Sequence, residues 1–239
     1  MIRFYALRLF RDYIGHLILI GLPVVLIYIL VSINTQHELA PSTKEAALYI
    51  GFIYIIMFQG FGAAYTFEGL EHDFYSPFKS RLLAAPINPA AFVWANIFFS
   101  SIVSFIQSLV IMTYIIVVFN VTVNNWALVV IVLLLGVILA QLLGAILIFY
   151  TKKASIAQAV LIFYIILTMM IAGFFMPLPE HGLTEFLEKY SSPLTWINHS
   201  IHSIMEGQFS DSIITVSLLI GTIALLMSLV IYKSKQVIQ

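Results

Sequence analysis

The sequence predicts an all-α membrane protein with six transmembrane helices. Of its 239 residues, 62% are hydrophobic and 9% are charged, whereas soluble domains carry charge on about a quarter of their residues. Residues 82–151 contain no Asp, Glu, Lys or Arg. Because about 20 apolar residues cross a hydrocarbon core, this run must fold back on itself. Continuous apolar runs without strict alternation favour helices over a closed barrel.

Six apolar segments are expected to cross the membrane, and the chain as a whole, 1–239, is expected to be one transmembrane domain. Short cytoplasmic loops carry an excess of Lys and Arg. With six crossings, both termini and the second and fourth loops share one side, which holds every cation except Lys44 and Lys189. That side is therefore predicted to be cytoplasmic. The six segments are 17–33, 46–66, 92–119, 126–149, 154–175 and 212–232.

The N-terminal segment 1–16 places apolar residues at helical spacing, with three arginines between them. Two interpretations remain open for it. It is an amphipathic helix that lies along the lipid headgroups, or a positive flank that only fixes the orientation of the chain. No small-residue cleavage site follows promptly, so the segment is expected to stay on the mature protein.

The loop 67–91 between the second and third spans is predicted to contain a short helix of about two turns. Acids at its start and cations at its end suit the dipole of a helix. Ser76 is a suitable N-cap, Pro77 fits an early helical position, and Pro86 stops the helix. An apolar face on a cytoplasmic loop needs a surface to rest on, either the bilayer interface or another protein. That face consists of Phe78, Leu82 and Leu83.

Two motifs carry a resemblance to a known family. LLAAPI at residues 82–87 follows acidic residues that leave the second span, and SSPLTW at residues 191–196 precedes the last span. This pattern resembles permeases of the ABC-2 type of bacterial ATP-binding-cassette exporters, and the resemblance extends over nearly the whole chain. It departs at Ser76-Pro77, where many members have Gly-Thr, which bears on the subfamily more than on the family.

The resemblance implies that the short loop helix is a coupling helix, which docks in a groove of a separate nucleotide-binding ATPase subunit. The chain has no G-x-x-x-x-G-K-[ST] phosphate loop, so it is expected not to be an enzyme itself and to hold no cofactor, while ATP and Mg bind the partner. A second copy of the chain or a related permease is a further expected partner. The alternative for the loop is a solvated linker. The expected ATPase contacts are Glu68, Glu71, Phe78, Lys79, Arg81, Leu82 and Leu83.

Polar residues recur at three- and four-residue spacing in the third span, so they share one face of that helix. Either this face lines a translocation pathway or it packs against neighbouring helices. No ionisable residue falls in the middle of a span, which argues against an ion-coupled transporter and favours an amphipathic or hydrophobic cargo such as a drug, an antimicrobial or toxin-like peptide, or a lipid-like molecule. The candidate pathway residues are Asn96, Ser100, Ser104 and Gln107.

Other small and polar residues of the spans are expected to serve helix packing. Gly136, Ala140 and Gly144 form a small-xxx-small ridge that lets another helix approach closely, within one subunit or between two. Isolated amides at Gln59, Gln141 and Gln158 can each be satisfied by a neighbouring helix.

The segment 176–211 keeps helical periodicity despite its prolines. The family resemblance implies two short re-entrant helices that form an external gate, with Phe186, Tyr190 and Trp196 as gate residues. His199 and His202 are three residues apart, but a metal site needs further ligands, so we expect interfacial histidines and no metal.

Two functions of other classes remain as alternatives. An intramembrane enzyme needs convergent acids and histidines at bilayer depth, and here the acids cluster in loops. A membrane channel or assembly factor that works without an ATPase would purify with no nucleotide-binding subunit. For the permease that the resemblance implies, the expected location is the plasma membrane of a bacterium.

Overall fold

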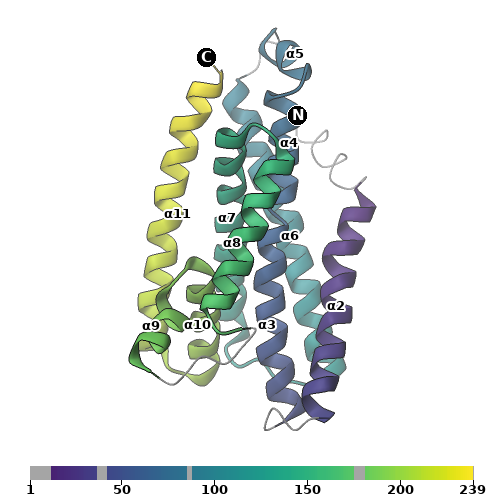
Figure 1. The fold of residues 1–239 in the computed structure, drawn as a ribbon, viewed down its shortest axis with the longest axis vertical. Helices are drawn as coiled ribbons and strands as arrows, with labels where there is room; N and C mark the ends of the chain where they lie inside the picture. Colours follow the sequence, from purple (N-terminus) through teal and green to yellow (C-terminus); the bar gives the residue numbers. More distant parts are fainter. Residues whose placement is uncertain (1–11, 37–41, 85–87, 175–180, 239) are drawn as a thin grey trace.

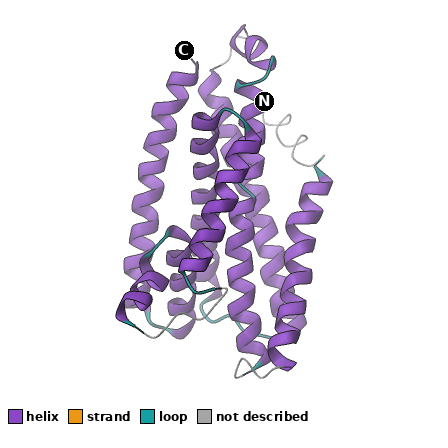
Figure 2. Ribbon diagram, in the orientation of Figure 1, coloured by secondary structure: helices purple, strands orange, loops and turns teal. Residues whose placement is uncertain are grey.

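The computed structural model describes residues 12–36, 42–84, 88–174 and 181–238, and every regular element in these ranges is a helix (Figures 1 and 2). The helices form an elongated bundle. They are α2 (Tyr13–Gln36), α3 (Thr43–Phe61), α4 (Ala64–Phe74), α5 (Phe78–Ala84), α6 (Pro89–Phe119), α7 (Trp126–Thr151), α8 (Ala154–Ile171), α9 (Gly182–Tyr190), α10 (Pro193–Glu206) and α11 (Phe209–Ile238).

Six helical stretches in the described part of the chain are long and apolar enough to cross a membrane, as predicted. They are α2, the combined α3 and α4, α6, α7, α8 and α11. Figure 1 places α5, the start of α2 and the end of α11 at one end of the bundle, here called the α5 end. The short helices α9 and α10 lie at the opposite end, called the α10 end.

The ends of the first two spans differ from the prediction. The first span begins at Tyr13, inside the N-terminal segment 1–16 for which an interfacial helix or a positive flank is predicted, and residues 1–11 of that segment fall outside the described residues. The second span continues through α4 to Phe74, so the start of the expected loop 67–91 is helical. Phe67, Leu70 and Phe74 repeat at spacings of three and four and are buried, which explains why the helix persists past the apolar stretch.

Two further ends also differ by a few residues. The fifth span ends at Ile171, four residues before the expected end, and residues 175–180 lie outside the described residues. The last span begins at Phe209, which shortens the expected external segment. The two short helices that fill the described part of this segment are α9 and α10.

The second span breaks between α3 and α4, at a turn against which α6 packs closely. Short bonds from Ala63 N to Gly60 O (3.1 Å) and from Thr66 N to Ala63 O (3.0 Å) tighten the turn. A Cβ on Gly62 would lie 2.7 Å from Ser104 Oγ of α6. Because glycine has no side chain, α6 can pack directly against the turn.

Helix α7 lies at the centre of the bundle and contacts α3, α4, α6, α8, α10 and α11. Its small-residue ridge packs within this chain, which decides the question that the sequence left open. A Cβ on Gly144 would lie 3.0 Å from Ala63 O, and one on Gly136 would lie 2.7 Å from Gln59 Oε1. The ridge therefore lets the second span lie close against α7.

Candidate functional site

The elbow formed by α4 and α5 projects at the α5 end of the bundle (Figure 1). Ser76 Oγ accepts a hydrogen bond from Phe78 N at 3.1 Å, and Ser76 O accepts one from Lys79 N at 3.0 Å. Pro77 occupies the position between them, where its missing N–H costs nothing. The short helix expected in this loop is thus present, and the structure describes it up to Ala84.

Among the described residues, Leu82, Phe78 and Lys79 attach α5 to the rest of the chain. The Leu82 side chain is buried, with 3% of its surface exposed. The Phe78 ring lies 5.2 Å from the His72 ring of α4, centroid to centroid. Lys79 Nζ donates a 2.9 Å hydrogen bond to Val237 O near the end of α11, where a cation also suits the helix dipole. Helix α5 is therefore held both by α4, the end of the second span, and by α11.

The seven residues predicted to contact an ATPase differ in how far they are exposed. Leu82 lies inside this chain rather than on the surface expected for a partner, because α5 folds its apolar face back onto the bundle. The side chain of Leu83 is outside what the structure describes. Arg81 and Glu68 are exposed and Glu71 is half-buried, so these charged side chains reach the surface of the described elbow.

Two polar groups of the elbow are buried, which the sequence analysis did not anticipate. Asp73 is fully buried, and its Oδ1 lies 3.1 Å from Nδ1 of the exposed His72. The Tyr75 hydroxyl has no hydrogen-bond partner among the described residues, and burial raises the pKa of Tyr75 to about 12. The signal in the sequence was the spacing of Asp73 from Leu70 and Phe67, which places it on the buried face of α4.

The polar face of α6 also points into the bundle. Asn96, Ser100, Ser104 and Gln107 are all buried. Gln141 of α7 donates to Ser104 Oγ at 2.9 Å and accepts from Thr66 of α4 at 2.6 Å. These are the interhelical bonds that the packing interpretation of this face requires.

A second amide extends this set of buried bonds. Gln59 of α3 donates to Ser108 Oγ at 3.0 Å and to Leu133 O at 3.2 Å. Hydrogen bonds of Gln59 and Gln141 therefore connect the second span with α6 and α7. We call the residues that make them the polar seam: Gln59, Thr66, Ser104, Ser108 and Gln141.

His16, which the sequence analysis did not single out, ties α2 to the bundle. The Tyr65 hydroxyl lies 2.7 Å from His16 Nδ1, and Gln107 Nε2 lies 3.0 Å from both. The Gln107 amide nitrogen donates to the Tyr65 hydroxyl, and the roles of the two contacts at His16 Nδ1 depend on the tautomer of the ring. This cluster joins the first, second and third spans.

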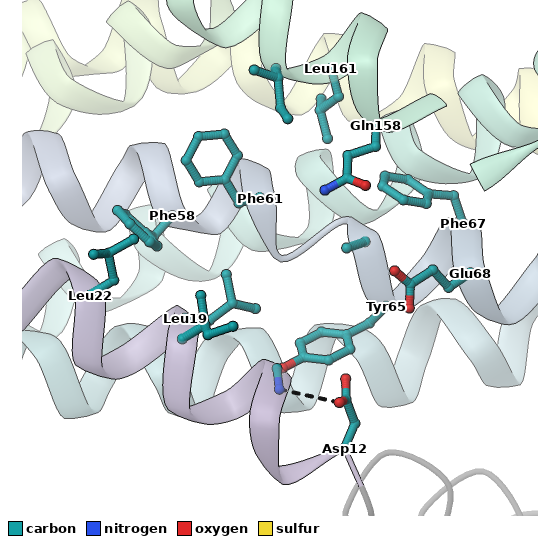
Figure 3. A pocket seen from close by; sticks show the side chains of 14 residues that line it. Asp12, Leu19, Leu22, Phe58, Phe61, Tyr65, Phe67, Glu68, Gln158 and Leu161 are labelled. Carbon is teal, nitrogen blue, oxygen red and sulfur yellow. Dashed lines mark hydrogen bonds between the residues drawn. The ribbon is translucent and has the colours of Figure 1, made fainter. Parts of the chain in front are cut away.

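A cavity of about 370 Å³ lies between α2, the second span and α8 (Figure 3). Figure 3 shows the side chains of Asp12, Tyr65 and Glu68 gathered at one end, with the Gln158 amide facing inward from α8. Leu22 and Phe58 lie toward the other end. The remaining lining residues are Gly15, Ile18, Leu19, Phe61, Ala64, Phe67, Leu161 and Ile162.

A second hollow of about 280 Å³ lies farther along the same three spans. It is lined by Leu30 and Asn34 of α2, by Tyr49, Ile50, Ile53, Tyr54 and Met57 of α3, by Met169 of α8 and by Phe174. The two hollows follow one side of the second span, between α2 and α8.

The three predicted gate residues come together at the α10 end. The Phe186 and Tyr190 rings are 5.4 Å apart, and Trp196 Nε1 donates to Tyr190 O at 3.0 Å. Burial lowers the pKa of His202, whose Nε2 has no hydrogen-bond partner among the described residues. Burial and, after it, Lys189 lower the pKa of His199.

A comparison with family models matches residues 29–232 to a family described as ABC-2 family transporter protein. The matched range contains the elbow, the polar seam, α9 and α10. Neither the comparison with curated proteins nor the comparison with solved structures gave a match.

Proposed function

Because this chain is a multi-pass membrane protein that belongs to the ABC-2 family of transporter proteins, we propose that it is the permease of an exporter driven by a separate ATPase subunit. The observation that carries the proposal is the elbow, whose short helix α5 projects from the bundle yet is fastened to α4 and α11. ATP and Mg bind the partner subunit in this scheme, and the permease supplies the path through the membrane.

The elbow has the attachments that a mechanical coupler needs. Lys79 links α5 to α11, and the contact of Phe78 with His72 links it to α4. A push on α5 therefore reaches both the second and the last span. The exposed Arg81 provides a charged contact that fixes the register of the docked partner.

The orientation follows from the cations of the α5 end. The turn between α7 and α8 carries Lys152 and Lys153, the end of α11 carries Lys233 and Lys235, and Arg81 lies on α5. Short cytoplasmic segments are rich in such residues. We therefore place the α5 end and both termini in the cytoplasm of a bacterial cell, with α9 and α10 outside as the gate segment.

The cargo is an amphipathic or hydrophobic molecule, and the groove between α2 and α8 is the surface that suits it best. Both hollows there combine aromatic and aliphatic walls with a few polar groups, as ligand pockets do. A second copy of the chain or a related permease completes the pathway. The buried α6 face, with Asn96 and Gln107 inside the bundle, serves packing in this arrangement.

Charge reversal on the elbow tests this function. The permease is co-expressed with an ATPase subunit encoded by a neighbouring gene and purified. The amount of ATPase subunit recovered with it is measured, and so is the ATP hydrolysis of the purified complex in proteoliposomes. Arg81→Glu should lower the recovery of the ATPase about tenfold, the effect of about 1.4 kcal/mol of lost binding. Lys189→Glu, an equal charge reversal on the exposed face of α9, should leave it unchanged. Equal recovery with both variants would contradict the proposed docking surface.

A further inference from the structure

We propose that the groove between α6, α7 and α11 holds an acyl chain of an anionic phospholipid, whose phosphate lies beside Lys235 at the α5 end. The groove has a volume of about 410 Å³, and its described lining residues are all different from those of the two hollows beside α2. The inference therefore depends neither on the path of the cargo nor on the docking of an ATPase.

The first argument is the length and position of the groove. Its wall on α6 runs from Trp94 to Ile106, which is about 18 Å along a helix that rises about 1.5 Å per residue. One leaflet accounts for about 15 Å of a hydrocarbon core about 30 Å thick. Because α6 begins at Pro89, next to α5 in the chain, Trp94 lies toward the α5 end of the groove. The groove thus matches the depth of the leaflet on that side, as a single acyl chain does.

The second argument is the chemistry of the walls. The side chains of Phe98 and Ile106 are 61% and 53% exposed, whereas Leu142 of α7 is buried. The Ser101 hydroxyl donates to Ile97 O at 2.7 Å, so its hydrogen is satisfied within α6 itself. A polar molecule would lose hydrogen-bond partners in such a groove. A hydrocarbon chain has none to lose.

The third argument is the sign of the charge near the groove. Helices α6 and α7 contain no charged residue, and α11 carries Lys233 and Lys235 near the α5 end and Asp211 at the other. Lys235 comes eight residues after Met227 of the groove wall, a spacing that places both on one stripe of the helix. Lys235 is exposed and makes no ion pair or hydrogen bond with another described residue. An anionic head therefore pairs with Lys235 while its chain passes Met227.

The α5 end of the groove offers two further groups to a phosphate. The Trp94 indole is half-buried, and its N–H has no hydrogen-bond partner among the described residues. Indole rings favour the headgroup level of a membrane, where the N–H donates to polar atoms of the lipid. Lys79 of α5 holds the end of α11 through Val237 O, and the exposed Arg81 of α5 adds positive charge at this end. An anionic head is therefore favoured there over a zwitterionic one.

A matched pair of photoreactive phospholipids tests the inference. Both carry the same diazirine in the middle of one palmitoyl chain, and one is a phosphatidylglycerol while the other is a phosphatidylcholine. Purified full-length permease is irradiated with each probe in nanodiscs that contain equal parts of the two unlabelled lipids. Mass spectrometry then locates the labelled peptides.

We expect the phosphatidylglycerol probe to label the groove-lining peptides of α6 and α7 about fivefold more than the phosphatidylcholine probe. That ratio corresponds to about 1 kcal/mol for one Lys near the headgroups. Ile213 and Ile214, which are exposed near the opposite end of α11, should be labelled equally by both probes.

Removal of one charge identifies the cation responsible. Lys235→Gln should abolish the preference for the phosphatidylglycerol probe. Lys233→Gln is the matched control on the same helix, because Lys233 Nζ lies 4.4 Å from the centroid of the Tyr150 ring and six residues after Met227, on a different stripe of α11. This control should keep the preference.

Filling the groove tests the position of the acyl chain. Ser101→Phe adds a ring to the groove wall and should lower the labelling of α6 and α7 by both probes. Ser217→Phe adds the same ring on the exposed surface of α11 and should leave this labelling unchanged.

Equal labelling of the groove by the two probes in the wild-type protein would overturn the inference. An undiminished preference in Lys235→Gln would also overturn it. A groove that neither probe labels, while Ile213 and Ile214 are labelled, would show that another protein surface, such as a second copy of the chain, covers it instead. The labelling uses no ATPase, so its outcome is separate from that of the docking experiment on the elbow.

Discussion

The centre and the edge of the bundle use the same residue type in two different ways. Gln141 of α7 is fully buried and joins α4 to α6 through two hydrogen bonds, whereas Gln158 of α8 is exposed and faces the cavity. In an apolar stretch of 18 residues from each span, 67% of the residues are buried in the second span and 61% in α7, but only 17% in α2 and 28% in α8. The central spans are therefore packed inside the chain, whereas most of the surface of the edge spans is left uncovered by it.

The largest expected effect comes from filling a close contact between α7 and the backbone of the second span. Gly144→Leu places a side chain against the backbone of Ala63, which cannot move aside, whereas a Cβ on Gly221 of α11 meets nothing within 4 Å. We expect Gly144→Leu to destabilise the fold by about 1–3 kcal/mol or more and Gly221→Leu to have little effect. Thermal unfolding of both variants in detergent measures the difference. Equal melting temperatures of the two variants would contradict the conclusion that the centre of the bundle is more tightly packed than its edge.

The two amides provide the next comparison. Gln141→Leu removes both bonds of the polar seam at that residue, and interhelical hydrogen bonds in membrane proteins are worth about 0.6 kcal/mol each, with a maximum of about 1.7. We therefore expect a loss of stability of about 1–2 kcal/mol. Gln158→Leu should change stability by less than about 0.5 kcal/mol. The same thermal measurement applies, and a greater loss for Gln158→Leu would contradict the assignment of the two residues.

Acid should distinguish the α10 end from the central spans. Burial holds the pKa of His202 below its ordinary value of 6.5. Between the folded pKa and pH 6.5, the unfolded chain therefore binds more protons than the folded chain. The stability contributed by the neutral ring is present above pH 6.5 and is lost as the pH falls toward the folded pKa. The amides and hydroxyls of the polar seam do not titrate there.

Hydrogen exchange, corrected for the intrinsic effect of pH, measures this difference. Helix α10 should lose protection between pH 7 and pH 5 before α7 does, and His202→Gln should reduce the loss. Uniform loss of protection across both helices would show that the histidine does not set the response.

A smaller effect on stability than that of Gly144→Leu or Gln141→Leu is expected at the elbow. Lys79→Met removes one hydrogen bond to Val237 O, and a partly exposed bond of this kind is worth about 0.5–1.5 kcal/mol. Thermal stability should therefore fall only slightly, while ATP hydrolysis by the co-purified complex should respond less to added cargo. A large loss of thermal stability, together with a normal response of ATP hydrolysis to cargo, would show that this contact serves stability rather than coupling.

Composition and periodicity predicted the six spans because lipid leaves the backbone few alternatives to helices. They also predicted that Phe78 and Leu82 need a covering surface. Periodicity cannot say which surface covers a face, and for Leu82 it is the chain itself. The same limit applies to the amides, since nothing local distinguishes Gln141 from Gln158. The His16 cluster depends on residues 49 and 91 positions away, so it emerges only with the fold.

Cross-linking from single cysteines tests most directly whether the elbow is the docking surface for a motor subunit. The chain has no native cysteine, so Ser80→Cys on α5 and Glu185→Cys on α9 each introduce one thiol at an exposed position. With a co-expressed ATPase subunit and a short bifunctional reagent, we predict an adduct from position 80 and none from position 185. An adduct from position 185 alone, or none from position 80 in an active complex, would contradict the account.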